Sequence, residues 1–222
     1  SLLPSLALGA VFGLALAAPP GPMNAVIAEE SVLRGWLAGF KAGLGAMTAD
    51  VCFFVLAFVG AVAFIGSMPT LRAVMVGTGG VLMLYFAYGA VTGAAKGVEW
   101  TSGESGKGFW KALVLALTNP YQIVFWLTVG VGLIQPGRVD VFAHLPYAGE
   151  ALTGLLVIRT GSPALLVGFF GGIGLWIVGF PASLITAGRR IDRFAPAVAY
   201  VSALVLALFG GWFLVDAAGS LL

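Results

Sequence analysis

The sequence predicts an all-α integral membrane protein with six transmembrane helices, built as two inverted three-helix repeats whose first and fourth helices are broken near the midplane. Composition is the first observation behind this prediction. Of the 222 residues, 60% are hydrophobic and 9% are charged, whereas a soluble domain carries about 25% charged residues. The second observation is that apolar residues gather into segments of the length a bilayer requires, about 20 residues. These segments are roughly 3–33, 36–65, 71–95, 108–134, 163–187 and 195–218.

The first segment is interrupted at residues 18–24, which read Ala-Pro-Pro-Gly-Pro-Met-Asn. Proline has no amide hydrogen, so in a helix these prolines would leave the carbonyls of Ala15, Leu16 and Ala18 without partners. In hydrocarbon such a break is tolerated only where it is buried in protein or lines a cavity. The pattern favours the broken helix of a secondary transporter. A tight turn between two helices at the membrane surface is the alternative.

An internal repeat is the third observation. Residues 39–45 and 168–174 both follow the pattern GFxxGxG, in the second and fifth segments. The fourth segment carries Asn119-Pro120, which matches the break in the first. We therefore expect a single transport domain, 1–222, with one repeat in 1–97 and the other in 107–222. Because each repeat has an odd number of helices, the two would have opposite orientations in the membrane.

The two breaks predict a substrate site. Asn119 can cap a helix and Pro120 suits a first helical position, as Pro22 does in the first segment. Two half-helix N-termini would then meet near the midplane and favour a carboxylate, while freed carbonyls accept an ammonium group. Asn119 could instead mark a plain kink, Thr48 could bond its own backbone, and Trp126 and Trp176 could be cavity walls or packing. The candidate substrate-binding residues are Pro20, Gly21, Pro22, Met23, Asn24, Thr48, Thr118, Asn119, Pro120, Tyr121 and Gln122.

Asp50 is the candidate proton-coupling residue, because it is the only acidic residue well inside a predicted span. Buried carboxylates in membranes are costly, and they usually face a polar cavity and carry protons or bind cations. A structural carboxylate that bonds a neighbouring helix is the alternative. Glu29 and Glu30 lie about two turns beyond the first break, and we expect both to be solvated near the cytoplasmic surface.

Basic residues predict the orientation. Most flank the first, third and fifth connections, which the positive-inside rule assigns to the cytoplasm, so both termini are expected outside. These residues are Arg34, Lys96, Lys107, Lys111, Arg189, Arg190 and Arg193, against Arg72, Arg138 and Arg159 on the other side. The long connection 135–162 contains a short apolar run, 151–158, which we expect to lie at the interface or to dip into the membrane. The first apolar run lacks the features of a cleaved signal peptide, so we expect it to be retained as a helix.

The sequence as a whole resembles the LysE/RhtB superfamily of bacterial and archaeal amino-acid exporters. The resemblance rests on Pro-Gly-Pro at 20–22, the glycine-spaced segment 35–50, Asn119-Pro120 preceded by Gly108-Phe109, and the six-span length. It implies functional roles for Pro20, Gly21, Pro22, Asp50, Asn119 and Pro120. Two departures concern the substrate: Ala49 replaces the usual glycine before Asp50, and Tyr121 replaces the usual basic residue after Asn119-Pro120.

We therefore expect a multi-pass transporter in the plasma membrane of a prokaryote that exports an amino acid or similar small zwitterion in exchange for protons. Its partners would be the substrate, protons and the lipid bilayer, with no nucleic acid, and a homodimer is left open. The alternative is a divalent-cation exporter of a related branch. A single cysteine, Cys52, and a single histidine, His144, argue against a thiol–disulfide carrier, a metal site and any cofactor. No nucleophile–base pair or metal motif indicates an enzyme.

Overall fold

The computed structural model describes residues 2–18, 21–60, 67–95, 107–140, 157–188 and 194–221, and nearly all of these are helical. The chain begins with α1 (Leu2–Ala17) and α2 (Pro22–Arg34), which meet at an angle of 84°. The predicted interruption of the first segment is therefore present. Pro22 occupies the first turn of α2, where a missing amide hydrogen leaves no hydrogen bond unmade. Pro20 lies outside the described residues.

Four described helices are long and apolar enough to cross a membrane: α3 (Trp36–Phe58), α10 (Pro163–Gly188) and most of α5 (Pro69–Ala95) and α11 (Phe194–Leu221). The bent pair α1–α2 makes a fifth if it is one span. Gly35 alone separates α2 from α3, and its φ of 94° is a conformation that other residues rarely adopt. Large apolar side chains are exposed on all four helices, which fits a surface that faces lipid.

The predicted fourth span, 108–134, is not one long helix. It consists of α6 (Lys107–Leu117), α7 (Pro120–Phe125), a π-helical turn η1 (Trp126–Gly130) and α8 (Val131–Ile134). The break before Pro120 was predicted, but the π-helical turn was not. Gly130 leaves room for the indole of Trp126, since a Cβ there would lie 2.4 Å from that ring. Among the described residues, the helices long and apolar enough to span number four, or five with the bent pair, and this segment is not one of them.

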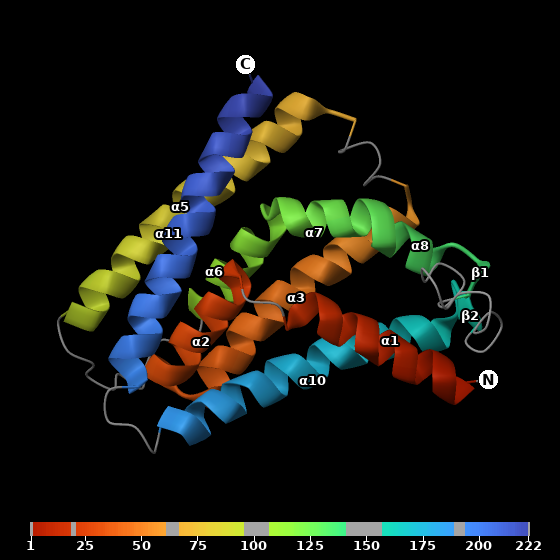
Figure 1. Cartoon of the computed structure of the whole chain (residues 1–222), viewed down its shortest axis with the longest axis horizontal. Coiled ribbons are helices and arrows are strands. Elements are labelled where there is room, and N and C mark those ends of the chain that lie inside the picture. The colour runs from red at the N-terminus through yellow and green to blue at the C-terminus, as the bar shows by residue number, and fades with distance from the viewer. Residues whose placement is uncertain are drawn as a thin grey trace, which may run out of the picture.

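Close glycine contacts join α1 to α10, and Figure 1 shows the two helices side by side. A Cβ on Gly9 would lie 2.1 Å from the carbonyl oxygen of Leu165, and one on Gly168 would lie 2.2 Å from that of Leu6. Gly13 and Gly172 make the same kind of contact one turn further along. The two backbones therefore touch without a side chain between them, as small residues allow in membrane helices.

Two other helix pairs pack closely in the helical body. α5 packs along α11 over most of its length, and α3 packs on α6, where a Cβ on Gly45 would lie 2.1 Å from the carbonyl oxygen of Phe109. α2 contacts α3, α11 and α10, so the short helix after the break lies inside the body. Eight of its thirteen residues from Ala25 to Val32 form an unbroken buried run.

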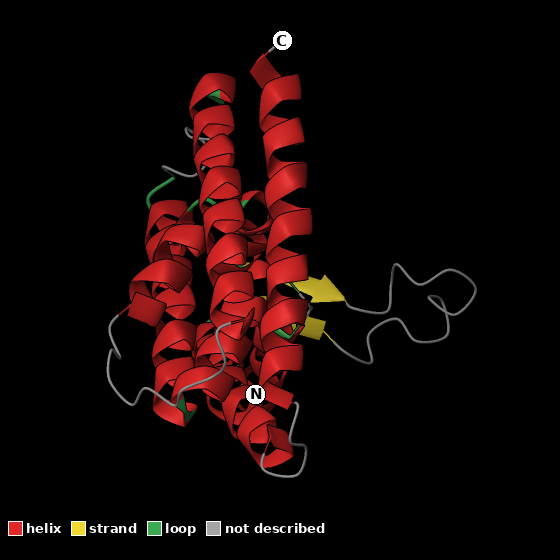
Figure 2. Cartoon of the chain, turned by 90° about the vertical axis from the view of Figure 1, so that its left-hand side faces the viewer, coloured by secondary structure: helices red, strands yellow, loops and turns green. Residues whose placement is uncertain are grey.

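The all-α prediction missed a small β-ribbon. β1 (Gly137–Asp140) pairs antiparallel with β2 (Val157–Thr160), with Gly137 opposite Thr160 and Asp140 opposite Val157. Figure 2 shows the two strands at the side of the helical body. The strands use the ends of the connection 135–162, so the last residues of the apolar run 151–158 lie in β2. The rest of that run lies outside the described residues.

Candidate functional site

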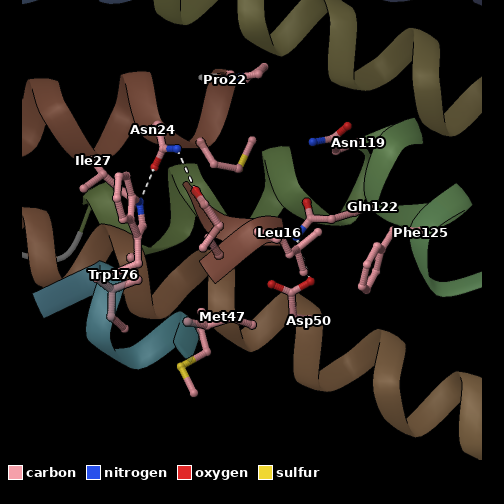
Figure 3. Close-up of a pocket in the computed structure, with 18 of the residues that line it drawn as sticks. Leu16, Pro22, Asn24, Ile27, Met47, Asp50, Asn119, Gln122, Phe125 and Trp176 are labelled. Carbon is pink, nitrogen blue, oxygen red and sulfur yellow. Dashed lines mark hydrogen bonds between the residues drawn. The ribbon is translucent and has the colours of Figure 1, made fainter. Parts of the chain in front are cut away.

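A cavity with a volume of about 580 Å³ lies where the two helix breaks approach each other. Its wall comes from α1, α2, α3, α7, η1, α10 and α11, and Figure 3 shows how these side chains converge. Most of the wall is apolar, with a few polar groups, which is typical of small-molecule sites. The apolar lining includes Phe12, Leu16, Met23, Ile27, Met47, Phe125, Val129, Ile173, Ile177 and Phe209.

Two hydrogen bonds through Asn24 join the end of α1, the start of α2 and α10 at the first break. Asn24 donates from Nδ2 to the carbonyl oxygen of Ala17 at 2.7 Å, so it satisfies a backbone group that the end of α1 leaves free. Trp176 of α10 donates from Nε1 to Oδ1 of Asn24 at 2.9 Å. Figure 3 shows both bonds. These two bonds fix the angle between α1 and α2 and tie the break to α10.

Asp50 is 4% exposed and lies on the α3 side of the cavity. Its Oδ1 accepts two hydrogen bonds, from Nε2 of Gln122 and from Nε1 of Trp126, each 3.0 Å long. Gln122 and Trp126 lie one helical turn apart, so one face of the α7–η1 segment holds the carboxylate. Oε1 of Gln122 is buried and has no hydrogen-bond partner among the described residues.

The second break contributes Asn119, which lies between α6 and α7 and is 7% exposed. Its amide hydrogen bonds the carbonyl of Ala116, and its carbonyl accepts the amide of Ile123, so the chain turns tightly before α7. The side chain of Asn119 lines the cavity. α7 has only six residues before the π-helical turn, so we assign no anion site to its N-terminus.

The cavity brings together most of the candidate residues from both halves of the chain. Thr48 and Thr118 are not among its lining residues. Their hydroxyls bond the carbonyls one turn earlier, Leu44 at 2.7 Å and Val114 at 2.9 Å, which is the alternative the sequence left open for Thr48. The side chains of Pro120 and Tyr121 lie outside the described residues, as does Pro20. The candidates that line the cavity are Gly21, Pro22, Met23, Asn24, Asp50, Asn119 and Gln122.

The expectation that Glu29 and Glu30 are solvated was wrong. They are 7% and 2% exposed, because α6 packs against this face of α2. Glu29 pairs with Lys111 of α6 at 3.0 Å, and Glu30 pairs with Arg34 one turn along α2. A Cβ on residue 108 would lie 2.9 Å from the carboxyl carbon of Glu30, so the glycine at the start of α6 makes room for this pair.

Two tryptophans were left open as packing or cavity walls, and both donate hydrogen bonds to residues that line the cavity. Trp176 lines the cavity and Trp126 donates to Asp50. A signal for Trp126 is present in the sequence, since Gln122 and Trp126 are four residues apart and can reach the same group. No comparable signal links Trp176 to Asn24. Within the described ranges, no group of three or more His, Cys, Asp or Glu side chains could hold a metal ion.

Comparison with known proteins gives a consistent result. The family model of the LysE type translocators matches residues 14–217. An uncharacterized membrane protein of Pseudomonas aeruginosa is 27% identical over 81% of this chain and 93% of its own length. A leucine efflux protein of Salmonella typhimurium is 30% identical over 57% of this chain, and the match spans 60% of that protein. A putative amino acid efflux protein of Bacillus subtilis is 28% identical over 66% of this chain and 73% of its own length. No solved structure matches the chain significantly.

Proposed function

The chain belongs to the family of LysE type translocators, and from this premise we propose that it exports an amino acid or a similar small zwitterion from the cytoplasm in exchange for protons. It is a multi-pass membrane protein. The bacterial origin of its relatives supports the plasma membrane of a prokaryote as its location. Two relatives are named for efflux of leucine or amino acids, which supports the substrate class.

The cavity between the two helix breaks is the observation that carries this proposal. It holds a single acidic side chain, Asp50, among the described lining residues, and it is otherwise largely apolar. A volume of about 580 Å³ lies within the usual range for small-molecule sites, about 300–1,000 Å³. The first turn of α2 lines it through Pro22, Met23 and Asn24, and helix N-termini favour carboxylates. A buried carboxylate in a membrane cavity is suited to carry the coupling proton.

Alternating access would use the two repeats, 1–97 and 107–222, as inverted halves. In this arrangement α1–α2 corresponds to the segment from α6 to α8, α3 corresponds to α10, and α5 corresponds to α11. Exchanging the two repeats turns the contact of α1 with α10 into the contact of α6 with α3. The same exchange leaves the contact of α5 with α11 unchanged. All three pairs are in contact, which supports the inverted repeat. The charge distribution supports termini on the outer side.

Efflux from proteoliposomes tests the function. Vesicles loaded with a mixed amino-acid pool are expected to lose one or a few amino acids selectively, and faster under an imposed pH gradient. Asp50→Asn is expected to abolish the dependence on the gradient while the protein still folds. Asp216→Asn is the matched control, since Asp216 lies on α11 and is not among the cavity-lining residues.

Two results would contradict the proposal. Gradient-driven efflux that persists in Asp50→Asn would make Asp50 a structural carboxylate. Loss of no amino acid from vesicles that contain folded protein would refute amino-acid export, and divalent cations would then be the substrates to measure in the same vesicles.

A further inference from the structure

Gln122 and Asp50 both line the cavity. Nε2 of Gln122 donates to Oδ1 of Asp50 at 3.0 Å, and the residue is 7% exposed. Figure 3 shows the amide oxygen on the side away from Asp50. Buried polar atoms are almost always hydrogen-bonded, and this buried oxygen has no partner among the described residues, although Gln122 itself is a cavity-lining residue. The oxygen of Gln122 therefore lacks a hydrogen-bond donor, and a ligand bound in the cavity would supply one.

Asp50 fixes the orientation of this amide. An ionised carboxylate only accepts hydrogen bonds, so Gln122 must turn its NH₂ group to Asp50 and its oxygen away from it. Trp126 donates to the same oxygen of Asp50 at 3.0 Å, which holds the carboxylate in place. A residue of the cavity wall therefore carries an unpartnered neutral acceptor, with a negative charge one hydrogen bond behind it. That combination favours a cationic donor over a neutral one.

We propose that Gln122 is a relay. Its oxygen accepts a hydrogen bond from the ammonium group of an aliphatic amino acid, while its NH₂ group donates a hydrogen bond to Asp50. This rests on the proposed function and names the orientation of the substrate in the same cavity. The ammonium group points to Gln122, the carboxylate points to the first turn of α2, and the side chain lies against apolar residues such as Leu16 and Ile173.

The relay makes binding of the proton and binding of the substrate compete. A protonated carboxyl has an O–H that needs an acceptor, and the oxygen of Gln122 meets that need once the amide turns over. The NH₂ group then points into the cavity, where it repels an ammonium group. Among the described lining residues, α1, α2, α7, α10 and α11 contribute no other titratable side chain. Binding of the proton and binding of the substrate thus exclude each other, which is the condition for their exchange.

Ligand binding to the purified full chain in detergent tests the relay. The probes are L-leucine and L-2-hydroxy-4-methylpentanoate, which carries a hydroxyl in place of the ammonium group. The wild type is expected to prefer leucine by about ten- to hundredfold, the range for a hydrogen bond to a charged group. Leucine affinity is also expected to fall between neutral and mildly acidic pH.

Two variants separate the relay from simple packing. Gln122→Met keeps the length of the side chain but removes both polar groups, so the preference for leucine and the dependence on pH should disappear. Gln122→Glu should keep the preference, because two adjacent carboxyls share one proton and an oxygen still faces the cavity. Thr48→Val is the control, since Thr48 lies on α3 near Asp50 but does not line the cavity.

The relay is overturned if folded Gln122→Met retains the preference, if Gln122→Glu loses it, or if leucine affinity in the wild type is independent of pH. Should Gln122→Met fail to fold, the Gln122→Glu variant and the pH series still decide the matter. A wild type that binds no amino acid contradicts the proposed function instead, so the two failures are distinguishable.

Discussion

The buried ion pair between α2 and α6 allows a quantitative prediction for Lys111→Met. Nζ of Lys111 is 3.0 Å from Oε2 of Glu29 and 4.8 Å from the centre of the Phe86 ring. The Lys111 and Glu29 side chains are 12% and 9% exposed, so solvent screens the pair only weakly. The substitution keeps most of the aliphatic volume and removes the charge. It therefore leaves the Glu29 carboxylate buried without its partner on α6.

The magnitude follows from the distance and the burial. At 3.0 Å and an effective dielectric constant of about 20, the attraction between the two charges is about 5–6 kcal/mol before desolvation. Removal of one partner of a buried pair costs about 3–5 kcal/mol, because the other charge stays buried. At about 2–4 °C per kcal/mol for a protein of this size, the midpoint of thermal unfolding should fall by about 6–20 °C.

Thermal unfolding of the detergent-purified protein, followed by circular dichroism, measures this effect. The double variant Glu29→Gln/Lys111→Met removes both charges and should recover most of the lost stability. Lys107→Met, at the exposed start of α6, is the matched control and should change stability by about 0.5 kcal/mol or less. A loss below about 1 kcal/mol for Lys111→Met, or a double variant less stable than the single one, would refute the reasoning.

Three further predictions follow from the packing. In a double-mutant cycle, Asn24→Ala and Trp176→Phe should show a coupling energy of about 1 kcal/mol in chemical unfolding, since each removes the same hydrogen bond; additive effects would mean that the bond contributes nothing. Gly13→Leu should prevent recovery of monodisperse protein in size-exclusion chromatography, because even a Cβ there would lie 2.0 Å from a backbone oxygen of α10; Gly171→Leu, with open space around it, should elute like the wild type, and equal behaviour of the two would contradict the helix contact. Thr48→Val should leave ligand affinity unchanged and stability within about 0.5 kcal/mol, and a clear loss of affinity in equilibrium binding would return Thr48 to the site.

Local chemistry made the helix breaks predictable. Prolines cannot donate backbone hydrogen bonds, so residues 18–24 identified the end of α1 and the start of α2, and Asn119-Pro120 identified the start of α7, from sequence alone. A carboxylate within an apolar segment is also a local anomaly, and Asp50 does lie in the cavity wall. These features need no knowledge of which helices are neighbours.

The remaining features depend on contacts between distant segments. Glu29 is buried because Lys111 on α6, far along the chain, supplies its counter-charge, and the sequence gives no sign of that pairing. The bond from Trp176 to Asn24 likewise depends on how α10 lies against the first break. The ribbon of β1 and β2 pairs the two ends of a long connection, so neither four-residue strand carries its own periodic signal.

The backbone contact between α1 and α10 constrains how the cavity can open. Helices that interlock through Gly9, Gly13, Gly168 and Gly172 cannot slide past each other by part of a turn without forcing a carbonyl oxygen into a neighbouring Cα. We therefore expect α1 and α10 to move together. Leu16 of α1 and Ile173 of α10 line the cavity, as does Asp50 of α3. If α1 and α10 shift together against α3, these two apolar side chains move relative to Asp50, and a bound molecule that contacts both would have to release one of them.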